Sequence, residues 1–184
     1  MDVGAINILI TGLPGSGKTT LIRQLVEPLR FLQPVGFYTE EIREGSVRLG
    51  FRLIDLEGEV LTLSHINIHS RHRVGKYGVD IPGFEAYLTS RDFSASSGRI
   101  VIIDEIGKME CLSQEFMRMM SEILDSNKIL LATIALRGFG IIDEIKRRHD
   151  VQLIELTVNN REVLGTEILK DIARLSTGLD IADH

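Results

Sequence analysis

The sequence contains a single cysteine, Cys111, so it cannot form an internal disulfide. A lone cysteine suits a reducing compartment, and this one is expected to be a small, half-buried apolar side chain. The chain also lacks any apolar run of about 18 residues, the length needed to cross a bilayer. Its first residues carry an acid and only a short apolar run, unlike a secretory signal. We therefore expect a cytoplasmic protein without a membrane partner.

An excess of basic residues is missing as well. The formal net charge is −5, and only 5% of the residues are aromatic. Surfaces that coat nucleic acid are basic, and single-strand binding uses aromatic stacking, so a nucleic-acid partner is left open but not favoured. The 184 residues, 43% of them hydrophobic, are enough for one domain over 1–184 with a real core. We expect a monomer or weak self-association.

Short apolar runs alternate with segments of helical periodicity over most of the chain. The runs predict buried strands at 5–11, 99–105, 128–135 and 151–158, and the periodic segments predict helices at 17–31, 112–126, 139–149 and 160–176. Strands that alternate with helices form a mainly parallel sheet covered on both faces. The predicted fold class is therefore α/β with three layers.

Residues 34–66 interrupt this alternation. Their period-2 pattern is broken at "EGS" and "EGE", which predicts antiparallel strands joined by tight turns, a β-hairpin insertion on the α/β core. Residues 67–82 are expected to be an exposed loop, and residues 83–97 a modest helix.

The stretch "GLPGSGKTT" follows the first strand and matches G-x-x-x-x-G-K-[ST]. Backbone N–H groups of such a loop wrap a phosphate, and the N-terminus of the next helix adds positive potential. Lys18 is expected to reach the β- and γ-phosphates, and the Thr19 hydroxyl to ligate Mg²⁺. The predicted nucleotide-binding residues here are Gly12, Leu13, Pro14, Gly15, Ser16, Gly17, Lys18, Thr19 and Thr20.

A second motif is "IVIIDEIGKME" at 100–110. A buried strand that ends in aspartate is where a P-loop protein places the residue that organises Mg²⁺, here Asp104. Glu105 follows, at the position where one large division of P-loop ATPases activates water. Those proteins insert a strand between the P-loop strand and the aspartate strand. Residues 128–135 would supply it, and the Thr133 hydroxyl could point towards the γ-phosphate.

Phosphoryl transfer also needs cations around the equatorial oxygens of the γ-phosphate. The candidates are Arg43, Arg48, Lys76, Lys108 and Arg137. The turn "TVNNRE" follows the last strand, where ligands of such folds bind, so it can reach the base. Asn160 could hydrogen-bond the edge of the base and Arg161 could stack on its face. An N-cap role for Asn160 is the alternative.

With these motifs in place, the chain resembles the THEP-type, or cancer-related, nucleoside-triphosphatases. The resemblance rests on "GLPGSGKTT", "GFYTEEIREGSVRLGF", "GKYGV", "VIIDEIGKME" and "NNRE", spread over residues 8–164. It implies a RecA-like P-loop core and Mg²⁺-dependent hydrolysis of several nucleoside triphosphates to diphosphate and phosphate, with weak base discrimination. The catalytic residues it implies are Lys18, Asp104 and Glu105, with Thr19 and Asp104 on the metal. Arg43, Arg48, Lys108 and Glu110 fall on motif positions whose roles it leaves open.

Two other functions stay open. A nucleoside, nucleotide or polynucleotide kinase could use residues 32–98 as an acceptor site, although no arginine-rich lid is present. An RNA- or DNA-binding ATPase could use Arg71, Arg73, Lys76 and the "KRRH" run at 146–149 as a groove for the strand. A switch GTPase is disfavoured because no N-K-x-D tetrapeptide occurs in the sequence.

Overall fold

The computed structural model describes residues 7–91, 93, 96–138 and 140–182. The strands are β1 (Asn7–Thr11), β2 (Val35–Glu44), β3 (Val47–Asp55), β4 (Val60–His65), β5 (Arg73–Val74), β6 (Tyr77–Val79), β7 (Ile100–Ile106), β8 (Ile129–Ile134) and β9 (Val151–Glu155). The α-helices are α1 (Lys18–Val26), α2 (Ile81–Arg91), α3 (Gln114–Leu124), α4 (Ile141–Lys146) and α5 (Arg161–Ala182), with short 3₁₀ helices η1 (Arg30–Leu32) and η2 (Glu110–Leu112).

The described strands form one sheet in the order β5-β6-β4-β3-β2-β7-β8-β1-β9. The strands that follow one another as β2, β7, β8, β1 and β9 in this order pair in parallel. The other strands extend this sheet by antiparallel pairing. The insertion predicted at 34–66 is therefore continuous with the central sheet, because β2 belongs to both parts. β8 lies between β1 and β7, as predicted for residues 128–135.

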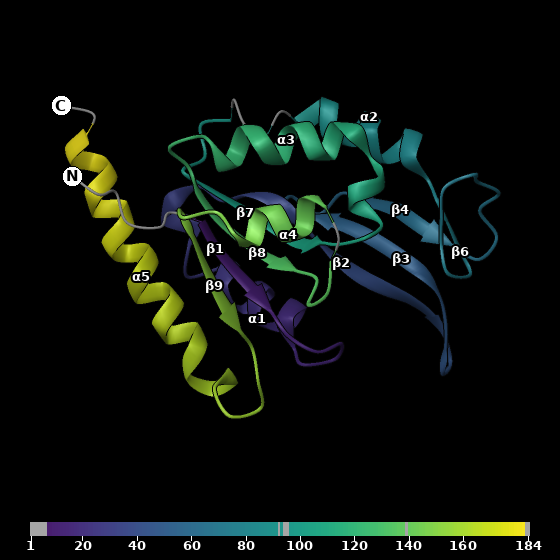
Figure 1. The fold of residues 1–184 in the computed structure, drawn as a ribbon, viewed down its shortest axis with the longest axis horizontal. Helices are drawn as coiled ribbons and strands as arrows, with labels where there is room; N and C mark the ends of the chain where they lie inside the picture. The colour runs from purple at the N-terminus through teal and green to yellow at the C-terminus, as the bar shows by residue number, and fades with distance from the viewer. Residues whose placement is uncertain (1–6, 92, 94–95, 139, 183–184) are drawn as a thin grey trace.

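The sheet separates two apolar clusters. One lies under α2, α3 and α4 and contains the buried rings of Phe37, Phe84 and Phe116. The other lies against α1 and α5 and contains Ile8 and Ile22. Figure 1 shows α2 and α3 along one face of the sheet, with α1 across the other. This arrangement confirms the three-layer α/β fold, and it explains why β1 and β8 are apolar on both faces.

Two predicted segments differ in the structure. The helix expected at 17–31 ends at Val26, because Pro28 has no N–H to continue the hydrogen-bond ladder. The loop expected at 67–82 contains the hairpin β5–β6, in which Gly75 adopts a positive φ of 58°. Tyr77 and Val79 of this hairpin are buried. Short strands of two or three residues leave too little periodicity to be read from a sequence.

The remaining helices lie close to their predicted positions. The helix expected at 83–97 begins at Ile81 and is described as far as Arg91; residues 92 and 94–95 lie outside the described residues, as do residues 5, 6 and 139 of other predicted elements. None of the described helices has the length and apolar character needed to cross a membrane.

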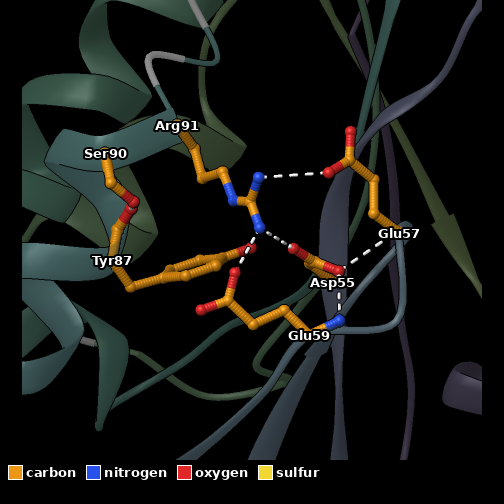
Figure 2. A network of polar contacts seen from close by, with 6 residues as sticks. All are labelled: Asp55, Glu57, Glu59, Tyr87, Ser90 and Arg91. Carbon is orange, nitrogen blue, oxygen red and sulfur yellow. Dashed lines mark hydrogen bonds and ion pairs between the residues drawn. The ribbon is translucent and has the colours of Figure 1, made fainter.

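A polar network joins the β3–β4 turn to α2 (Figure 2). Asp55 is only 4% exposed and accepts hydrogen bonds from the backbone N–H groups of Glu57, at 2.9 Å, and Glu59, at 2.8 Å. Its other oxygen pairs with the Arg91 guanidinium at 2.8 Å. Arg91 also pairs with the carboxylates of Glu57 and Glu59. Asp55 thus shapes the turn and connects it to α2.

Replacing Asp55 should therefore destabilise the fold. We expect Asp55→Ala to lower the free energy of unfolding by about 2–3 kcal/mol, because two backbone N–H groups and a partly buried guanidinium lose their acceptor. Glu57→Ala is the matched control and should change it by less than about 0.5 kcal/mol, since the Glu57 side chain is 79% exposed. Urea unfolding of both variants measures the difference. Equal effects would contradict the role given to Asp55.

Candidate functional site

The loop between β1 and α1 has the backbone that a phosphate-binding loop requires. Gly12, Gly15 and Gly17 have φ values of 151°, 76° and 98°, a region that side chains disfavour. A Cβ on Gly12 would also approach the carbonyl oxygen of Leu156 to 2.6 Å. The loop is thus packed against the end of β9, while Leu13, Pro14, Gly15 and Thr20 are exposed to solvent.

The polar side chains at this loop include one held by backbone carbonyl groups and two without a hydrogen-bond partner among the described residues. The Lys18 ammonium donates hydrogen bonds to the carbonyl oxygens of Gly12, at 3.0 Å, and Leu13, at 3.2 Å. The Ser16 and Thr11 hydroxyl oxygens are buried and have no hydrogen-bond partner among the described residues. Buried polar atoms without partners are rare in native proteins, so they indicate a ligand or water at this loop.

Asp104 is the junction of the site. It lies in β7, is 1% exposed, and its carboxylate accepts a hydrogen bond from the Thr19 hydroxyl at 2.7 Å. It accepts a second bond from the Thr133 hydroxyl of β8 and a third from the backbone N–H of Thr39 in β2. The Thr133 hydroxyl, predicted to point towards a phosphate, is thus bound to Asp104. Helix α1 and three neighbouring strands therefore meet at one carboxylate.

The acidic groups of this site are difficult to ionise. Burial raises the pKa of Asp104, and the bonds from Thr133, Thr19 and Thr39 and the charge of Lys18 oppose the rise. Burial also raises the pKa of Glu105; the neighbouring Asp104 charge adds to this rise, and Lys18 again opposes it. A cation near Asp104 would relieve this repulsion.

A third carboxyl group lies next to Glu105. Glu110 begins η2 and is 5% exposed. A Cβ placed on Gly107 would lie 2.8 Å from both the Glu105 Oε1 and the Glu110 Oε2 atom, so the two carboxyl groups approach the same point. Burial raises the pKa of Glu110 to about 8, with the Glu105 charge as the next cause. The sequence placed Glu110 in a motif but gave no reason to expect it beside Glu105.

The donor set around Thr19 fits Mg²⁺. A hydroxyl and a carboxylate oxygen 2.7 Å apart are hard ligands that can share one small ion. The described residues contain no group of three or more His, Cys, Asp or Glu side chains that could hold a metal ion. Mg²⁺ commonly binds through one or two protein oxygens, waters and substrate phosphates, so this sparse set is what such an ion uses.

The structure does not bring Arg43 and Arg48 to the loop. Residue Tyr38 of β2 is paired with Asp104, and Arg43 lies five residues further along the strand, roughly 17 Å away at the usual rise. Both arginines pair with Glu41, and Arg48 also donates to the Tyr77 hydroxyl at 3.0 Å. Lys108 is exposed and lies three residues after Glu105 in the sequence. The catalytic roles of these three cations stay predictions.

Two other arginines lie closer to Asp104 and were not predicted. Arg23 of α1 and Arg52 of β3 both pair with Glu40, which follows Thr39 in β2. The Arg23 guanidinium also lies 4.9 Å from the centre of the Tyr38 ring. The period-2 pattern of β2 places Tyr38 and Glu40 on one face. The β2–β7 register pairs Tyr38 with Asp104, and this brings that face beside Asp104. A sequence alone does not reveal this register.

The side chain of Asn160 is engaged in its own turn. Its amide oxygen accepts from the Thr157 N–H at 2.8 Å, and its amide nitrogen donates to the Glu155 carbonyl at 2.8 Å. It therefore closes the turn between β9 and α5, the alternative to reading a base. Arg161 is exposed at the start of α5. Its stacking role stays a prediction.

Comparisons with known proteins place these features in a wider context. A family model described as NTPase matches residues 7–169. The chain is 45% identical over 166 residues to nucleoside-triphosphatase THEP1 of Thermotoga maritima, covering 89% of this chain and 94% of that protein. It is 39% identical over 181 residues to the cancer-related nucleoside-triphosphatase of Homo sapiens, covering 90% and 95%.

Solved structures agree with these matches. The crystal structure of THEP1 from Aquifex aeolicus superposes with a TM-score of 0.79 at 40% identity, over 89% of this chain and 97% of that one. The solution structure of a human cancer-related nucleoside triphosphatase gives a TM-score of 0.75 at 36% identity, over 90% and 96%. The resemblance found in the sequence motifs is thereby confirmed.

The turn role of Asn160 can be separated from base recognition. We expect Asn160→Ala to lower the free energy of unfolding by about 1–2 kcal/mol, because the turn loses its side-chain bonds. Its affinities for ATP and GTP should change by the same factor. Asn159→Ala, at the exposed neighbouring position, is the control and should change neither quantity. A changed ratio of ATP to GTP affinity at unchanged stability would instead support base reading.

Proposed function

The chain belongs to the NTPase family, and from that premise we propose that it hydrolyses nucleoside 5′-triphosphates, ATP and GTP among them, to diphosphate and phosphate in an Mg²⁺-dependent reaction. One observation carries the proposal: Glu105 directly follows Asp104 in a buried strand end, and the charge of Lys18 acts on both. A carboxylate beside a metal-organising aspartate is placed to activate water. Loss of the γ-phosphate to water is therefore the favoured fate.

The phosphate loop and Lys18 bind the triphosphate. Backbone N–H groups of the glycine-rich loop, to which Pro14 contributes none, would surround the phosphates, and the first turn of α1 adds its positive dipole. Lys18 exchanges its two carbonyl partners for β- and γ-phosphate oxygens. These carbonyls are neutral acceptors, and a bond from an ammonium group to a charged phosphate is stronger. The exchange therefore favours nucleotide binding.

Thr19 and Asp104 would hold Mg²⁺, which supplies, when bound, charge that neutralises the β- and γ-phosphate oxygens. The Thr133 hydroxyl and the Thr39 N–H keep the Asp104 carboxylate in place. Because the carboxylate is fixed by groups from β2 and β8, ligand binding requires no rearrangement of these strands.

Glu105 is the proposed general base. Its burial makes the carboxylate a better proton acceptor, since a raised pKa brings it closer to the working pH. The carboxylate takes a proton from the attacking water as the oxygen approaches the γ-phosphorus. Weak base discrimination fits the turn at Asn160, whose amide is already engaged.

The role of Glu105 is tested by Glu105→Gln. We expect phosphate release from ATP and GTP to fall by about 10²–10⁴-fold, the usual contribution of a general base, while the nucleotide Kd stays within about threefold. Glu122→Gln on the exposed face of α3 makes the same chemical change outside the site and should leave turnover unaltered. Undiminished release by Glu105→Gln would remove Glu105 from the mechanism. Labelled phosphate appearing on an added nucleoside or RNA 5′ end would favour the kinase alternative.

The metal requirement is tested by chelation and by Thr19. EDTA should abolish phosphate release, and added Mg²⁺ should restore it. Thr19→Ala should raise the Mg²⁺ concentration for half-maximal turnover by about tenfold or more, because one hydroxyl ligand is lost. Thr19→Ser keeps the hydroxyl and should behave like the parent protein. Turnover that persists in excess EDTA would contradict the assignment.

A further inference from the structure

The loop after Glu105 is built around a buried acid. Residues 107–112 turn away from β7, with the Cys111 N–H donating to the Gly107 carbonyl at 3.0 Å. The Glu110 carboxyl group folds back over this turn and accepts from the Gly107 N–H and from its own N–H. The loop is also held from outside, because the Ser64 hydroxyl of β4 contacts the Met109 sulfur at 3.3 Å. Glu110 therefore lies in a hydrogen-bonded turn that contacts β4.

Gly107 leaves the space in which the two glutamates meet. A Cβ at this position would lie 2.8 Å from an oxygen of each carboxyl group and 3.1 Å from the Glu105 Cγ atom. Gly107 is not among the glycines with a positive φ, so its backbone would accept alanine. A glycine is therefore needed here to leave space for the Glu105 and Glu110 side chains. The backbone conformation does not require it.

We propose that Glu110 is a positioning residue: its carboxyl group, packed beside that of Glu105 over Gly107, holds the Glu105 carboxylate in the direction of the γ-phosphate. The inference rests on the proposed function, in which Glu105 activates water. In this role, Glu110 touches neither substrate nor metal and acts only through Glu105.

The charges around Glu110 support a neutral acid in this role. The charges that contribute most to the pKa of Glu110 are those of Glu105 and Asp104 in β7. Its neighbour Cys111 stays a thiol, because burial and then the charges of Glu110 and Glu105 raise its pKa to about 12. From the next helix, α3, the adjoining cap Ser113 donates its hydroxyl to Glu85 of α2. With a pKa of about 8, Glu110 is mostly protonated at pH 7, and a neutral carboxyl beside a carboxylate attracts where a second charge would repel.

A carboxyl group is more than the loop itself requires. The amide oxygen of a glutamine would accept the same two backbone N–H groups, and it would bury no ionisable group. The role proposed for Glu110 needs the shape and the neutral state of this group beside Glu105, and glutamine offers both, so Glu110→Gln is the conservative variant.

Three variants test the proposal. Gly107→Ala should displace both carboxyl groups and lower kcat by about 10–100-fold, the scale of a misplacement near 1 Å, with nucleotide Kd within threefold. Glu110→Ala should lower kcat by a similar factor. Glu110→Gln keeps shape and hydrogen bonding and should stay within about threefold of the parent at pH 7. Glu122→Gln is the matched control. Gly107→Ala and Glu110→Ala with parental kcat would overturn the proposal.

The pH profile of kcat separates positioning from structure. Below pH 8 the parent carries a protonated Glu110; above it, a second charge arises beside Glu105, so kcat should fall on the alkaline side. Glu110→Gln cannot ionise and should keep its kcat up to about pH 9.5. An alkaline fall of equal size in both proteins, or none in the parent, would overturn the proposal. If the positioning role fails but the parent hydrolyses ATP and Glu105→Gln abolishes this activity, the proposed function still stands. If the parent releases no phosphate, the proposed function itself is wrong.

Correct folding of Glu110→Gln is checked by its stability. The Glu110 pKa lies above its ordinary value of 4.5 in the fold, so its contribution to stability is complete below pH 4.5 and is lost as pH rises through 8. The glutamine variant lacks this loss. Its melting temperature at pH 9 should therefore be no lower than that of the parent.

Discussion

The structure depends on the burial of one carboxylate, that of Asp104. Three donors meet it: the Thr19 hydroxyl from α1, the Thr133 hydroxyl from β8 and the Thr39 N–H from β2. These bonds join the phosphate loop to the centre of the sheet, since α1 begins directly after the loop. A buried charge is costly unless it is hydrogen-bonded, so the arrangement is stable only because all three donors converge. The same constraint places Thr19 and Asp104 where a cation can be shared.

Three acidic side chains are concentrated around this junction. Asp104, Glu105 and Glu110 are all buried or half-buried, their pKa values are raised by burial, and Lys18 opposes the rise at Asp104 and Glu105. The carboxylates of such a site repel one another until cations bind together with the substrate. The energetic conflict is typical of functional sites, where groups are held in states that folding alone would not choose. A protonated Glu110 reduces the conflict while it keeps Glu105 in place.

Much of this site could be predicted from the sequence because its parts are contiguous. The phosphate loop lies within nine residues, and Asp104 and Glu105 directly follow the apolar run "IVII" of a strand. The β8 insertion followed from the same logic. The Glu40 network with Arg23 and Arg52 was missed because it depends on the β2–β7 register, a tertiary fact. Arg43 and Arg48 were candidates because phosphoryl transfer needs cations and because both lie in a motif, but the length of the β2–β3 hairpin carries them away from Asp104.

In the proposed mechanism, Glu105 faces the γ-phosphate while Lys18 holds it. A crystal structure with a non-hydrolysable ATP analogue and Mg²⁺ measures this most directly, through the distance from the Glu105 carboxylate to the γ-phosphorus. We expect room for one water between them, hydrogen-bonded to the carboxylate, with Lys18 moved from the Gly12 and Leu13 carbonyls to the phosphates. A γ-phosphate that faces the β2–β3 hairpin, with Glu105 turned away and Lys18 still on those carbonyls, would contradict it.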